Sequence, residues 1–340
     1  MVFFLALGLA KKKRLVFKQY CACRETISMN EKIVLTVCTA AYLAQAKALG
    51  DSLLKFNTGY KLVIGLVDKL NGRTDSSYWR PHELIEVQEL HIPEFEKMSK
   101  QYTTLELVCA LKSFYTDHLF KLHNPDQVIF LDCDILILDS LGYIESELNF
   151  FSILLSAHIT KPFPNDGHKP EEKTILKTGM FNAGFYAVKN DENGKNFISW
   201  WKERMIDQCY ERPKEGLNAD QKWLNFLPFY FKKVKILDHP GCNFAYWNFH
   251  ERTLEKKQDK FFVNNEPLLF FHYSGYSPDD PDRISRHQDR FKMNANPALN
   301  ELFNICRESL VQNRNEDFQK MICFYQKSSG GFLKKLRLKK

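Results

Sequence analysis

One stretch decides the fold of this 340-residue chain: residues 128–138, which read VIFLDCDILIL. Four apolar residues lead into two aspartates, and a second apolar run follows them. The first run predicts a buried strand, because the sequence NPD at 124–126 marks a turn upstream. Carboxylates in the middle of a buried strand would be costly to desolvate. We therefore expect the strand to end at Leu131 and to place Asp132 and Asp134 at its carboxyl edge, where open α/β sheets bind ligands.

Two aspartates separated by one residue around a bend can direct two oxygen ligands at one divalent cation. Mn²⁺ and Mg²⁺ prefer such hard ligands, and waters or substrate phosphates can fill the remaining positions. A capped turn or a solvated strand edge would also explain Asp132 and Asp134, because so short a motif often arises by chance. The choice between a metal site and a structural role therefore depends on polar residues elsewhere in the chain.

The composition suits one large α/β domain or two smaller ones, with 44% hydrophobic and 14% aromatic residues. The net charge is +7, but the excess lies in residues 11–14 and 334–340, and the chain between them is nearly balanced. Nucleic-acid binding across the fold is therefore not indicated. The basic tail, with its interleaved leucines, is explained equally by contact with an anionic membrane surface and by a disordered, solubilising terminus.

The first residues read as an arm outside the fold. The apolar run 2–10 is too short to span a bilayer as a helix, and the basic cluster follows it, whereas a signal peptide has its basic residues first. A short membrane-associating arm is one explanation. We favour a translation extension, because Met29 followed by a strand resembles a natural start.

The nine cysteines show neither a CxxC pair nor a zinc-site spacing, and several lie inside apolar runs. Buried free thiols in a reducing compartment are the simplest expectation. The chain also shows no internal repeat.

The N-terminal part predicts a parallel βαβ unit. Its strand, helix and strand are expected at residues 33–38, 43–56 and 62–68. A nucleotide lying over the end of the first strand would meet Thr39, Ala40 and Tyr42, which form the turn into the helix.

The remaining elements follow from apolar periodicity and turn residues. Further strands are expected at residues 84–87, 151–155, 179–188, 234–237 and 267–276. Helices are expected at residues 103–122 and 193–210, from 217 onward, and within 297–326. Residues 160–177 predict a long loop of the kind that forms a lid or binds an acceptor.

Four polar positions are candidates for chemistry. Lys112 lies on the helix before the Asp-x-Asp strand, where a solvated face is the simpler explanation. Asn182 stands between two strand glycines, which often mark a bulge or a ligand approaching closely. Asp220 begins a helix whose N-terminus would orient it. His272 ends a strand and becomes a candidate third metal ligand beside the Asp-x-Asp pair.

A basic cluster follows His272 and supplies positive charge suited to a diphosphate. Its members are Arg283, Arg286, His287 and Arg290.

Together these segments resemble the GT-A-fold glycosyltransferases, specifically the bacterial branch of the glycogenin-like and lipopolysaccharide galactosyltransferase-like family 8. The resemblance runs from about Lys32 to Arg290. The segments that carry it are TAAY at 39–42, Lys112, FLDCD at 130–134, FNAG at 181–184, DQ at 220–221 and FHYSG at 271–275.

The resemblance implies a GT-A-type, Rossmann-like mixed sheet flanked by helices, with C-terminal helices added to a single main domain. It implies an arm at 1–28, a glycosyltransferase domain at 29–292 and a helical segment with the basic tail at 293–340. It also implies Mn²⁺ or Mg²⁺ held by Asp132, Asp134 and His272.

The donor implied is a nucleotide sugar, a UDP-sugar in this family. Tyr42 would stack on the base, and Gln221 would lie near the anomeric carbon. The residues implied to contact the donor are Thr39, Ala40, Tyr42, Lys112, Asp132, Cys133, Asp134, Asn182, Gly275 and Arg286. The residues implied to act in catalysis are Asn182, Asp220 and Gln221.

Two departures from the family pattern matter. The family places an acidic residue just before the Tyr42 position, where this chain has alanines that offer no carboxylate to the base. The family also places Lys-Pro-Trp after the His-x-x-Gly motif, where this chain reads YSPD at 276–279. Arg286 or His287 would then have to replace the missing lysine.

The function expected is metal-dependent hexosyl transfer to a glycan or lipid-linked acceptor in surface polysaccharide synthesis. The resemblance implies retention of configuration, and the expected location is cytoplasmic, at the inner face of the membrane. A nucleotidyltransferase of related fold is disfavoured because TAAY is not a glycine-rich, basic phosphate loop. A non-catalytic sugar-binding protein that used Trp247 and Tyr276 is also disfavoured. Such a protein needs no diphosphate-binding group, so it would not explain the Asp-x-Asp pair, Asn182, Asp220 and His272.

Overall fold

The stretch that anchors the fold forms strand β4, which ends at Leu131 directly before Asp132, as predicted. The structure is a computed structural model that describes residues 31–326. The expectations for residues 1–28 and for the basic tail at 334–340 fall outside the described residues.

The strands of the described chain agree with most of the expected positions. They are β1 (Lys32–Cys38), β2 (Tyr60–Leu66), β3 (Glu83–Glu86), β4 (Gln127–Leu131), β5 (Ile135–Ile137), β6 (Ile153–Ala157), β7 (Phe181–Lys189), β8 (Val234–Ile236), β9 (Leu254–Lys257), β10 (Lys260–Val263), β11 (Glu266–Pro267) and β12 (Phe270–His272).

The helices alternate with these strands through most of the chain. The α-helices are α2 (Leu43–Phe56), α3 (Phe95–Gln101), α4 (Thr104–Leu122), α5 (Gly142–Leu148), α6 (Glu172–Thr178), α7 (Glu192–Met205), α8 (Leu227–Tyr230), α9 (Pro297–Gln312) and α10 (Asn315–Phe318). The 3₁₀ turns are η1 (Ala40–Tyr42), η2 (Val87–Leu90), η3 (Pro213–Glu215), η4 (Gln221–Phe226), η5 (Tyr246–Asn248) and η6 (Met293–Ala295).

Three sequence expectations need correction. The predicted loop at 160–177 contains helix α6. The helix expected at 193–210 ends earlier, at Met205. The helix expected from 217 onward is the 3₁₀ turn η4, which continues into the short helix α8.

The main sheet is a seven-stranded mixed sheet in the order β3-β2-β1-β4-β7-β6-β8. Strands β3, β2, β1 and β4 are parallel, and β7 runs antiparallel to both β4 and β6. The chain leaves β1 for β2 on one side, whereas β4 pairs with β1 on the other side. Such a reversal of strand order is where doubly wound sheets bind ligands. It brings Asp132 and the turn after β1 to the same edge of the sheet.

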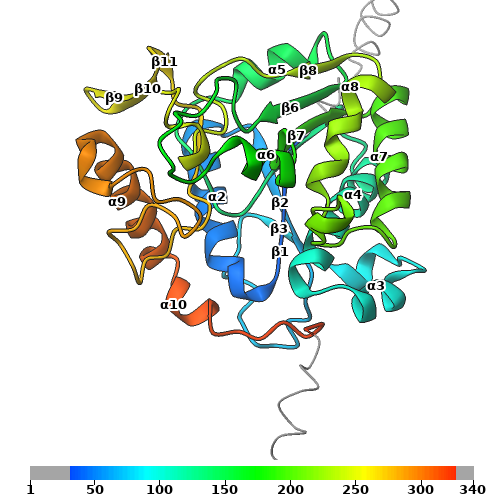
Figure 1. The fold of residues 1–340 in the computed structure, drawn as a ribbon. Coiled ribbons are helices and arrows are strands. Elements are labelled where there is room, and N and C mark those ends of the chain that lie inside the picture. The colour runs from blue at the N-terminus through cyan, green and yellow to red at the C-terminus, as the bar shows by residue number, and fades with distance from the viewer. Residues whose placement is uncertain (1–30, 327–340) are drawn as a thin grey trace, which may run out of the picture. The chain divides into compact units, whose positions relative to one another are not determined.

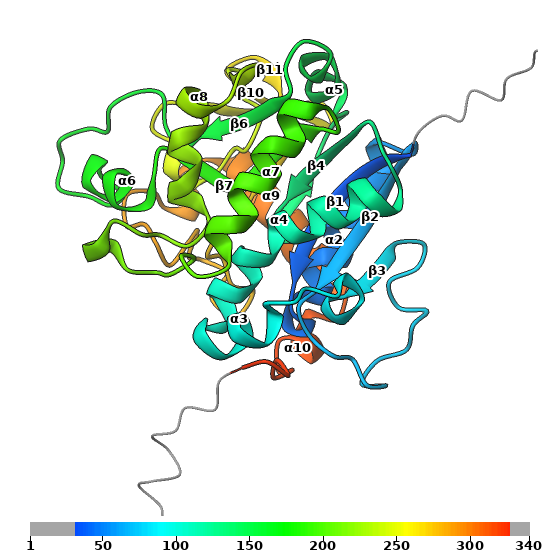
Figure 2. The same ribbon diagram turned by 90° about the vertical axis from the view of Figure 1, so that its right-hand side faces the viewer.

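Helices cover both faces of this sheet because the strand residues alternate in direction. Ile33 and Leu35 of β1 pack in one core with α4 and α7, and Val34 between them packs in a second core with α2 and α5. Figure 1 shows α4 and α7 on the opposite side of the sheet from α2, and Figure 2 shows α4 and α7 crossing in front of the strands. The expected α/β class, a mixed sheet flanked by helices, is confirmed.

A small second sheet joins two distant segments. Strand β12 pairs antiparallel with β5, so that His272 lies opposite Ile135 and Phe270 opposite Ile137. The backbone N–H of Tyr273 continues the ladder with a 3.0 Å hydrogen bond to the carbonyl oxygen of Asp134. Because β5 directly follows the Asp-x-Asp bend, this pairing carries the end of β12 to the metal-site candidates.

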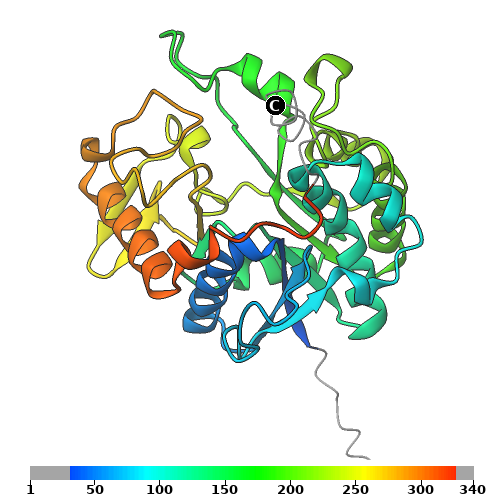
Figure 3. The same ribbon diagram turned by 90° about the horizontal axis from the view of Figure 1, so that it is seen from below.

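The last described residues cross the carboxyl end of β2 (Figure 3). The Cys323 thiol donates to the carbonyl oxygen of Val67, and the Phe324 N–H donates to the buried carboxylate of Asp68. Arg73 pairs with the same carboxylate at 2.7 Å and donates to the carbonyl oxygen of Ile322. The C-terminal segment is therefore fixed to the sheet by named polar contacts.

Two properties of residues 31–326 bear on the sequence analysis. Their cysteines are free thiols, as expected, and most of these are buried. None of their helices combines the length and the apolar character that crossing a bilayer requires.

Candidate active site

Asp132, Asp134 and His272 converge at the carboxyl edge of β4. One ligand atom from each side chain lies within 4.8 Å of the other two, and Nε2 of His272 lies 3.0 Å from Oδ1 of Asp134. Two carboxylates and one imidazole form a donor set compatible with Mn²⁺ or Mg²⁺. The residues present therefore fit the divalent ion that the sequence predicted.

The two partners also set each other's ionisation. Burial disfavours the charge of Asp134, but the charge and hydrogen bond of His272 outweigh burial and lower the pKa of the carboxyl. Burial alone would lower the pKa of the imidazole, but Asp134 outweighs it and raises the pKa of His272. Asp134 and His272 thus each favour the charged form of the other in the protein without metal.

Gly184 of β7 makes room for these ligands. A Cβ atom at this position would lie 2.5 Å from Cε1 of His272, 2.8 Å from Oδ2 of Asp132 and 2.8 Å from Oδ1 of Asn182. Real Cβ contacts are never this short, so any larger residue must displace a side chain of the candidate metal site. The presence of a glycine in the FNAG segment therefore has a steric explanation.

Replacing Gly184 with alanine is expected to weaken Mn²⁺ binding by at least about 10-fold, because displacing a ligand or its support typically costs that much. The measurement is a titration of the purified variant with Mn²⁺, followed by the paramagnetic resonance signal of the free ion. Gly65→Ala is the matched control, since its Cβ would lie 2.8 Å from the ring of Tyr115, away from the ligands. Equal Mn²⁺ affinities for the two variants would contradict the steric role of Gly184.

Lys112 is buried behind the metal-site candidates. Its side chain is 5% exposed, so the solvated face considered for it is wrong. Its Nζ lies 3.0 Å from Oδ1 of Asp132 and 3.2 Å from Oδ2 of Asp220, and it donates to the carbonyl oxygen of Ala183 at 3.1 Å. Despite burial, the two carboxylates raise the pKa of Lys112 well above its ordinary value. The lysine is therefore a permanent cation between two acids.

Asp220 lies just before η4 and is buried, with 2% of its surface exposed. Burial raises the pKa of its carboxyl; Lys112 opposes this rise, and Asp132 adds to it. Its backbone carbonyl accepts a hydrogen bond of 3.3 Å from Nε1 of Trp201 in α7. The core thus fixes Asp220 next to the Asp-x-Asp bend.

Asn182 and Gln221 meet beside these acids. Nδ2 of Asn182 donates to Oε1 of Gln221 at 3.3 Å, and the same oxygen accepts from the backbone N–H of Ala183 at 3.1 Å. Nε2 of Gln221 donates to the carbonyl oxygen of Thr178 at 3.0 Å. The three residues expected to act in catalysis are thus brought together with Lys112 and the metal-site candidates.

Tyr42 and Arg286 approach the same centre from other parts of the chain. Burial raises the pKa of the Tyr42 hydroxyl, Cys133 and Asp134 raise it further, and Arg286 opposes the rise. Tyr42 thus lies within electrostatic range of the Asp-x-Asp bend and of Arg286. Tyr42 is 47% exposed and is thus accessible to a ligand.

Gly275 supports the turn that carries Arg286. Its φ is +73°, and a Cβ atom there would lie 2.6 Å from both Oγ of Ser285 and Cδ2 of His287. Its carbonyl oxygen accepts from the backbone N–H of Arg286 at 3.0 Å. Arg286 in turn donates from Nε to Nε2 of His287 at 3.1 Å, and its own side chain is exposed.

Arg290 belongs to the same basic cluster in the sequence, but its contacts lie in another segment. It forms an ion pair with Asp166 and donates to the carbonyl oxygens of His168 and Pro170 at 2.9 and 3.1 Å. Its charge anchors the segment before α6. Among the arginines of the basic cluster, Arg286 is the one near the site, and Arg283 donates to the Arg286 carbonyl oxygen at 3.3 Å.

Thr39 and Ala40 lie where the sequence placed them, in the turn after β1, and both are buried. The Ala40 N–H donates to the carboxylate of Asp68 at 3.2 Å, and the Thr39 carbonyl oxygen accepts from the N–H of Tyr42 at 3.0 Å. These bonds fix the turn that presents the tyrosine.

Two buried residues of the site were not singled out from the sequence. Asn243 contacts both His272 and Asn182, and His158 lies 3.4 Å from Nδ2 of Asn182. Burial lowers the pKa of His158 to about 4, so it is neutral at physiological pH. The only available signal for Asn243 was its place in the amide-rich segment 243–248.

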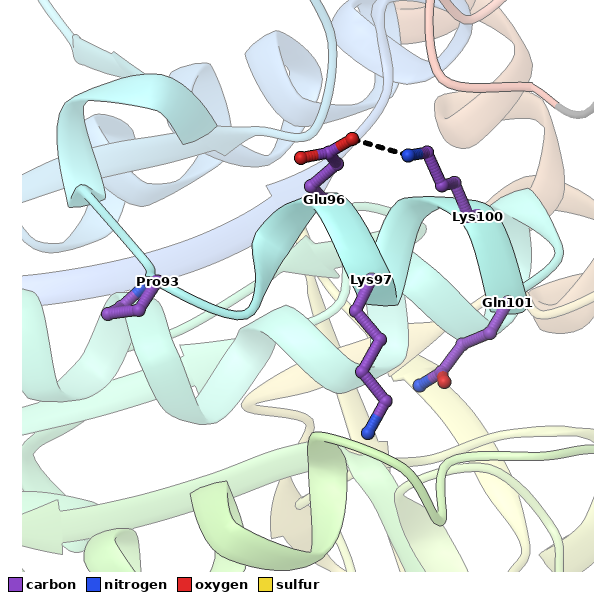
Figure 4. Close-up of a pocket in the computed structure, with 5 residues that line it drawn as sticks. All are labelled: Pro93, Glu96, Lys97, Lys100 and Gln101. Atoms are coloured by element: carbon purple, nitrogen blue, oxygen red, sulfur yellow. Dashed lines mark hydrogen bonds and ion pairs between the residues drawn. The ribbon is translucent and has the colours of Figure 1, made fainter.

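A separate hollow lies beside α3, away from these residues. Its lining consists of Pro93, Glu96, Lys97, Lys100 and Gln101, and Figure 4 shows Lys100 paired with Glu96 one turn away. None of the predicted site residues lines it, so it has no part in the site.

Comparison with known proteins places this geometry in context. No protein-family model matches the chain. It is 25% identical over 285 residues to the uncharacterized protein YfnF of Bacillus subtilis (strain 168), which covers 82% of this chain and 92% of YfnF. It is 24% identical over 205 residues to YfnD of the same organism, covering 58% of this chain and 63% of YfnD.

Among solved structures, the galactosyltransferase LgtC in complex with donor and acceptor sugar analogs is similar to this chain. The TM-score is 0.51 at 18% sequence identity, and the match covers 82% of this chain and 95% of LgtC. At this identity the likeness concerns the fold. The chain therefore has the GT-A glycosyltransferase fold, as the order of its sequence motifs indicated.

Proposed function

We propose that this protein is a metal-dependent glycosyltransferase that moves a hexose from a UDP-sugar to a glycan or lipid-linked acceptor. The observation that carries the proposal is the convergence of Asp132, Asp134 and His272 at the switch-point edge of a GT-A sheet. The complex of LgtC with donor and acceptor sugar analogs supports a sugar-transfer reaction on this fold.

The charge balance supports a divalent ion. Lys112 lies within 3.2 Å of the carboxylates of Asp132 and Asp220, and Asp134 is a neighbour of Asp132 in the candidate metal site. A metal on Nε2 requires the neutral form of His272, and the three carboxylates with Lys112 then carry two net negative charges, which a divalent cation would neutralise. When bound, Mn²⁺ or Mg²⁺ would stabilise the negative charge that develops on the leaving diphosphate.

The chain's own residues would divide the remaining work. The exposed guanidinium of Arg286 would add positive charge for the diphosphate, in place of the family's missing lysine. Tyr42 would stack on the base. Asn182, Asp220 and Gln221 would hold the sugar in one orientation, since backbone groups and Lys112 already fix their side chains.

We propose retention of configuration. An inverting reaction needs a carboxylate that accepts the acceptor proton. Asp220 is buried and bound to Lys112, so it is not presented as an open base. In the retaining reaction the bond from C1 to the phosphate oxygen breaks, the bond from C1 to the acceptor oxygen forms, and the leaving phosphate takes the acceptor proton.

Our proposal extends to the setting of the reaction. The acceptor would belong to surface polysaccharide synthesis, and the reaction would take place in the cytoplasm at the inner face of the membrane. The catalytic domain would be residues 29–292, with residues 293–340 as an added C-terminal segment.

Thermal unfolding with UDP, GDP, CDP or ADP, each with and without Mn²⁺, tests the proposal. A ligand that binds only the folded state at 100 times its Kd adds about 2.7 kcal/mol of stability. We expect stabilisation by UDP in the presence of Mn²⁺, and then slow hydrolysis of a UDP-sugar without acceptor. Stabilisation by another nucleotide alone would overturn the proposed UDP donor. The absence of any nucleotide effect would overturn the proposed glycosyltransferase function.

A further inference from the structure

Asn243 lies directly behind His272 and is completely buried. Its Oδ1 is 3.1 Å from Nδ1 of His272, on the side of the ring away from Asp134. Its Nδ2 donates to Oδ1 of Asn182 at 3.0 Å and to Oγ of Ser156 at 3.3 Å. Every polar atom of this side chain therefore has a partner, and two of the partners belong to the candidate active site.

The backbone holds Asn243 in place independently of its side chain. Its φ is +53°, a left-handed conformation that asparagine tolerates better than most residues. Its carbonyl oxygen accepts a hydrogen bond of 3.0 Å from Nδ2 of Asn248. The next residue, Phe244, accepts from the N–H of His272 at 2.9 Å, so asparagine and histidine are fixed to each other through the main chain as well.

The orientation of each amide follows from backbone groups, which cannot be reversed. Gln221 must present Oε1 to the N–H of Ala183 and Nε2 to the carbonyl oxygen of Thr178. Oε1 then faces Asn182, which must present Nδ2 to it. The N–H of Gly184, which donates to Oδ1 of Asn182 at 3.2 Å, requires the same orientation.

The orientation of Asn182 fixes the remaining links. Because Oδ1 of Asn182 can only accept, Asn243 must present Nδ2 to it and Oδ1 to His272. Oδ1 of Asn243 also can only accept, so Nδ1 of His272 must carry a hydrogen. In the neutral ring the lone pair is then on Nε2, the atom that faces Asp134 and the candidate metal position.

We propose that Asn243 is a positioning residue for the metal, which sets the tautomer and ring orientation of His272 through a chain of side-chain amides anchored on the backbone of β7. The inference rests on the proposed metal-dependent function. Metal-binding histidines generally donate their second N–H to a fixed acceptor, and removal of that acceptor costs metal affinity. A side-chain carboxamide supplies the acceptor here, without adding charge to a group already rich in carboxylates.

Asn243→Gly tests the inference in the full-length protein without substrate. Glycine tolerates the left-handed backbone and removes the side chain with its amide. We expect the Kd for Mn²⁺ to rise about 10- to 100-fold, measured by the paramagnetic resonance of free Mn²⁺. An unchanged Kd would overturn the inference while leaving the metal site standing. Failure of the wild-type protein to bind Mn²⁺ would overturn both.

Asn57→Gly is the matched control. Asn57 is also a buried asparagine whose amide makes two hydrogen bonds, to the N–H of Leu141 at 2.8 Å and to the carbonyl oxygen of Asp139 at 3.3 Å. It lies outside the chain of amides described above. Its loss should lower the unfolding temperature and leave the Kd for Mn²⁺ unchanged. An equal loss of Mn²⁺ affinity in both variants would assign the effect to general destabilisation and overturn the inference.

Asn243→Asp separates acceptor chemistry from shape. The aspartate keeps an oxygen for the Nδ1 hydrogen of His272 but cannot donate to Oδ1 of Asn182, so we expect a smaller loss of Mn²⁺ affinity than in Asn243→Gly. If this variant binds as weakly as Asn243→Gly, the acceptor role is wrong.

The tautomer itself can be observed without altering Asn243. Protein labelled with ¹⁵N-histidine and loaded with diamagnetic Mg²⁺ should show His272 with its hydrogen on Nδ1. His272→Asn identifies the signal by its loss. A hydrogen on Nε2 of His272 would overturn the inference whether or not the glycine variant folds.

Discussion

Asp134→Asn is expected to reduce both Mn²⁺ affinity and Mn²⁺-dependent UDP-sugar hydrolysis by at least about 100-fold. Asparagine keeps the shape of the side chain but removes one negative charge from the candidate metal ligands. It also removes the charge partner of His272, 3.0 Å away, which now holds the imidazole toward the site. The measurements are a Mn²⁺ titration and the rate of UDP release at saturating Mn²⁺.

A neighbouring aspartate provides the control for this experiment. Asp139 lies just after β5, pairs with Lys260 at 3.2 Å and takes no part in the candidate metal site. Asp139→Asn should bind Mn²⁺ and hydrolyse donor like the wild type. Near-wild-type Mn²⁺-dependent activity in Asp134→Asn, with the fold intact, would make the metal assignment untenable.

Lys112→Met is expected to lower the free energy of unfolding by about 3–5 kcal/mol, because it leaves buried carboxylates without their cation. Asp220 is the main cause, since its side chain is 3% exposed and it lies 3.2 Å from the lysine Nζ. Asp132 is 28% exposed and can be partly solvated. Urea unfolding without metal measures the loss.

A second substitution shows whether the loss comes from the unpaired charge. Lys112→Met combined with Asp220→Asn removes both the cation and its most deeply buried partner. The double variant should be more stable than Lys112→Met alone, a non-additivity expected for groups in direct contact. Additive losses would mean that Lys112 stabilises the fold by packing alone, for which its position 4.8 Å from the Phe130 ring centre offers a reason.

Local sequence predicted the sheet edge well. The apolar run before Asp132 predicted a buried strand with the two carboxylates following it, and β4 ends at Leu131 as expected. The same reasoning placed Thr39 to Tyr42 in the turn after β1, and the pattern of strand, helix and strand required a parallel pairing. These conclusions depend on contacts between residues close in sequence, so the sequence carries them directly.

Elements governed by distant contacts were predicted less well. The β9–β10 hairpin was not expected, because β9 is largely polar and exposed and the turn at Gln258 and Asp259 lacks a glycine. The segment from Asp220 onward was expected to be a regular helix. It instead forms a 3₁₀ turn, in which Gln221 bridges to β7.

The sequence by itself determined which residues stand at strand ends, and so which side chains were candidates for metal and donor binding. Only the tertiary structure decided how they combine. The β5–β12 ladder sets His272 beside Asp134 across more than 130 residues of chain, and burial turns Lys112 from a surface lysine into a cation between two acids. The role inferred for Asn243 arises in the same way, because the direction of an amide depends on partners that only the folded chain brings within hydrogen-bonding distance.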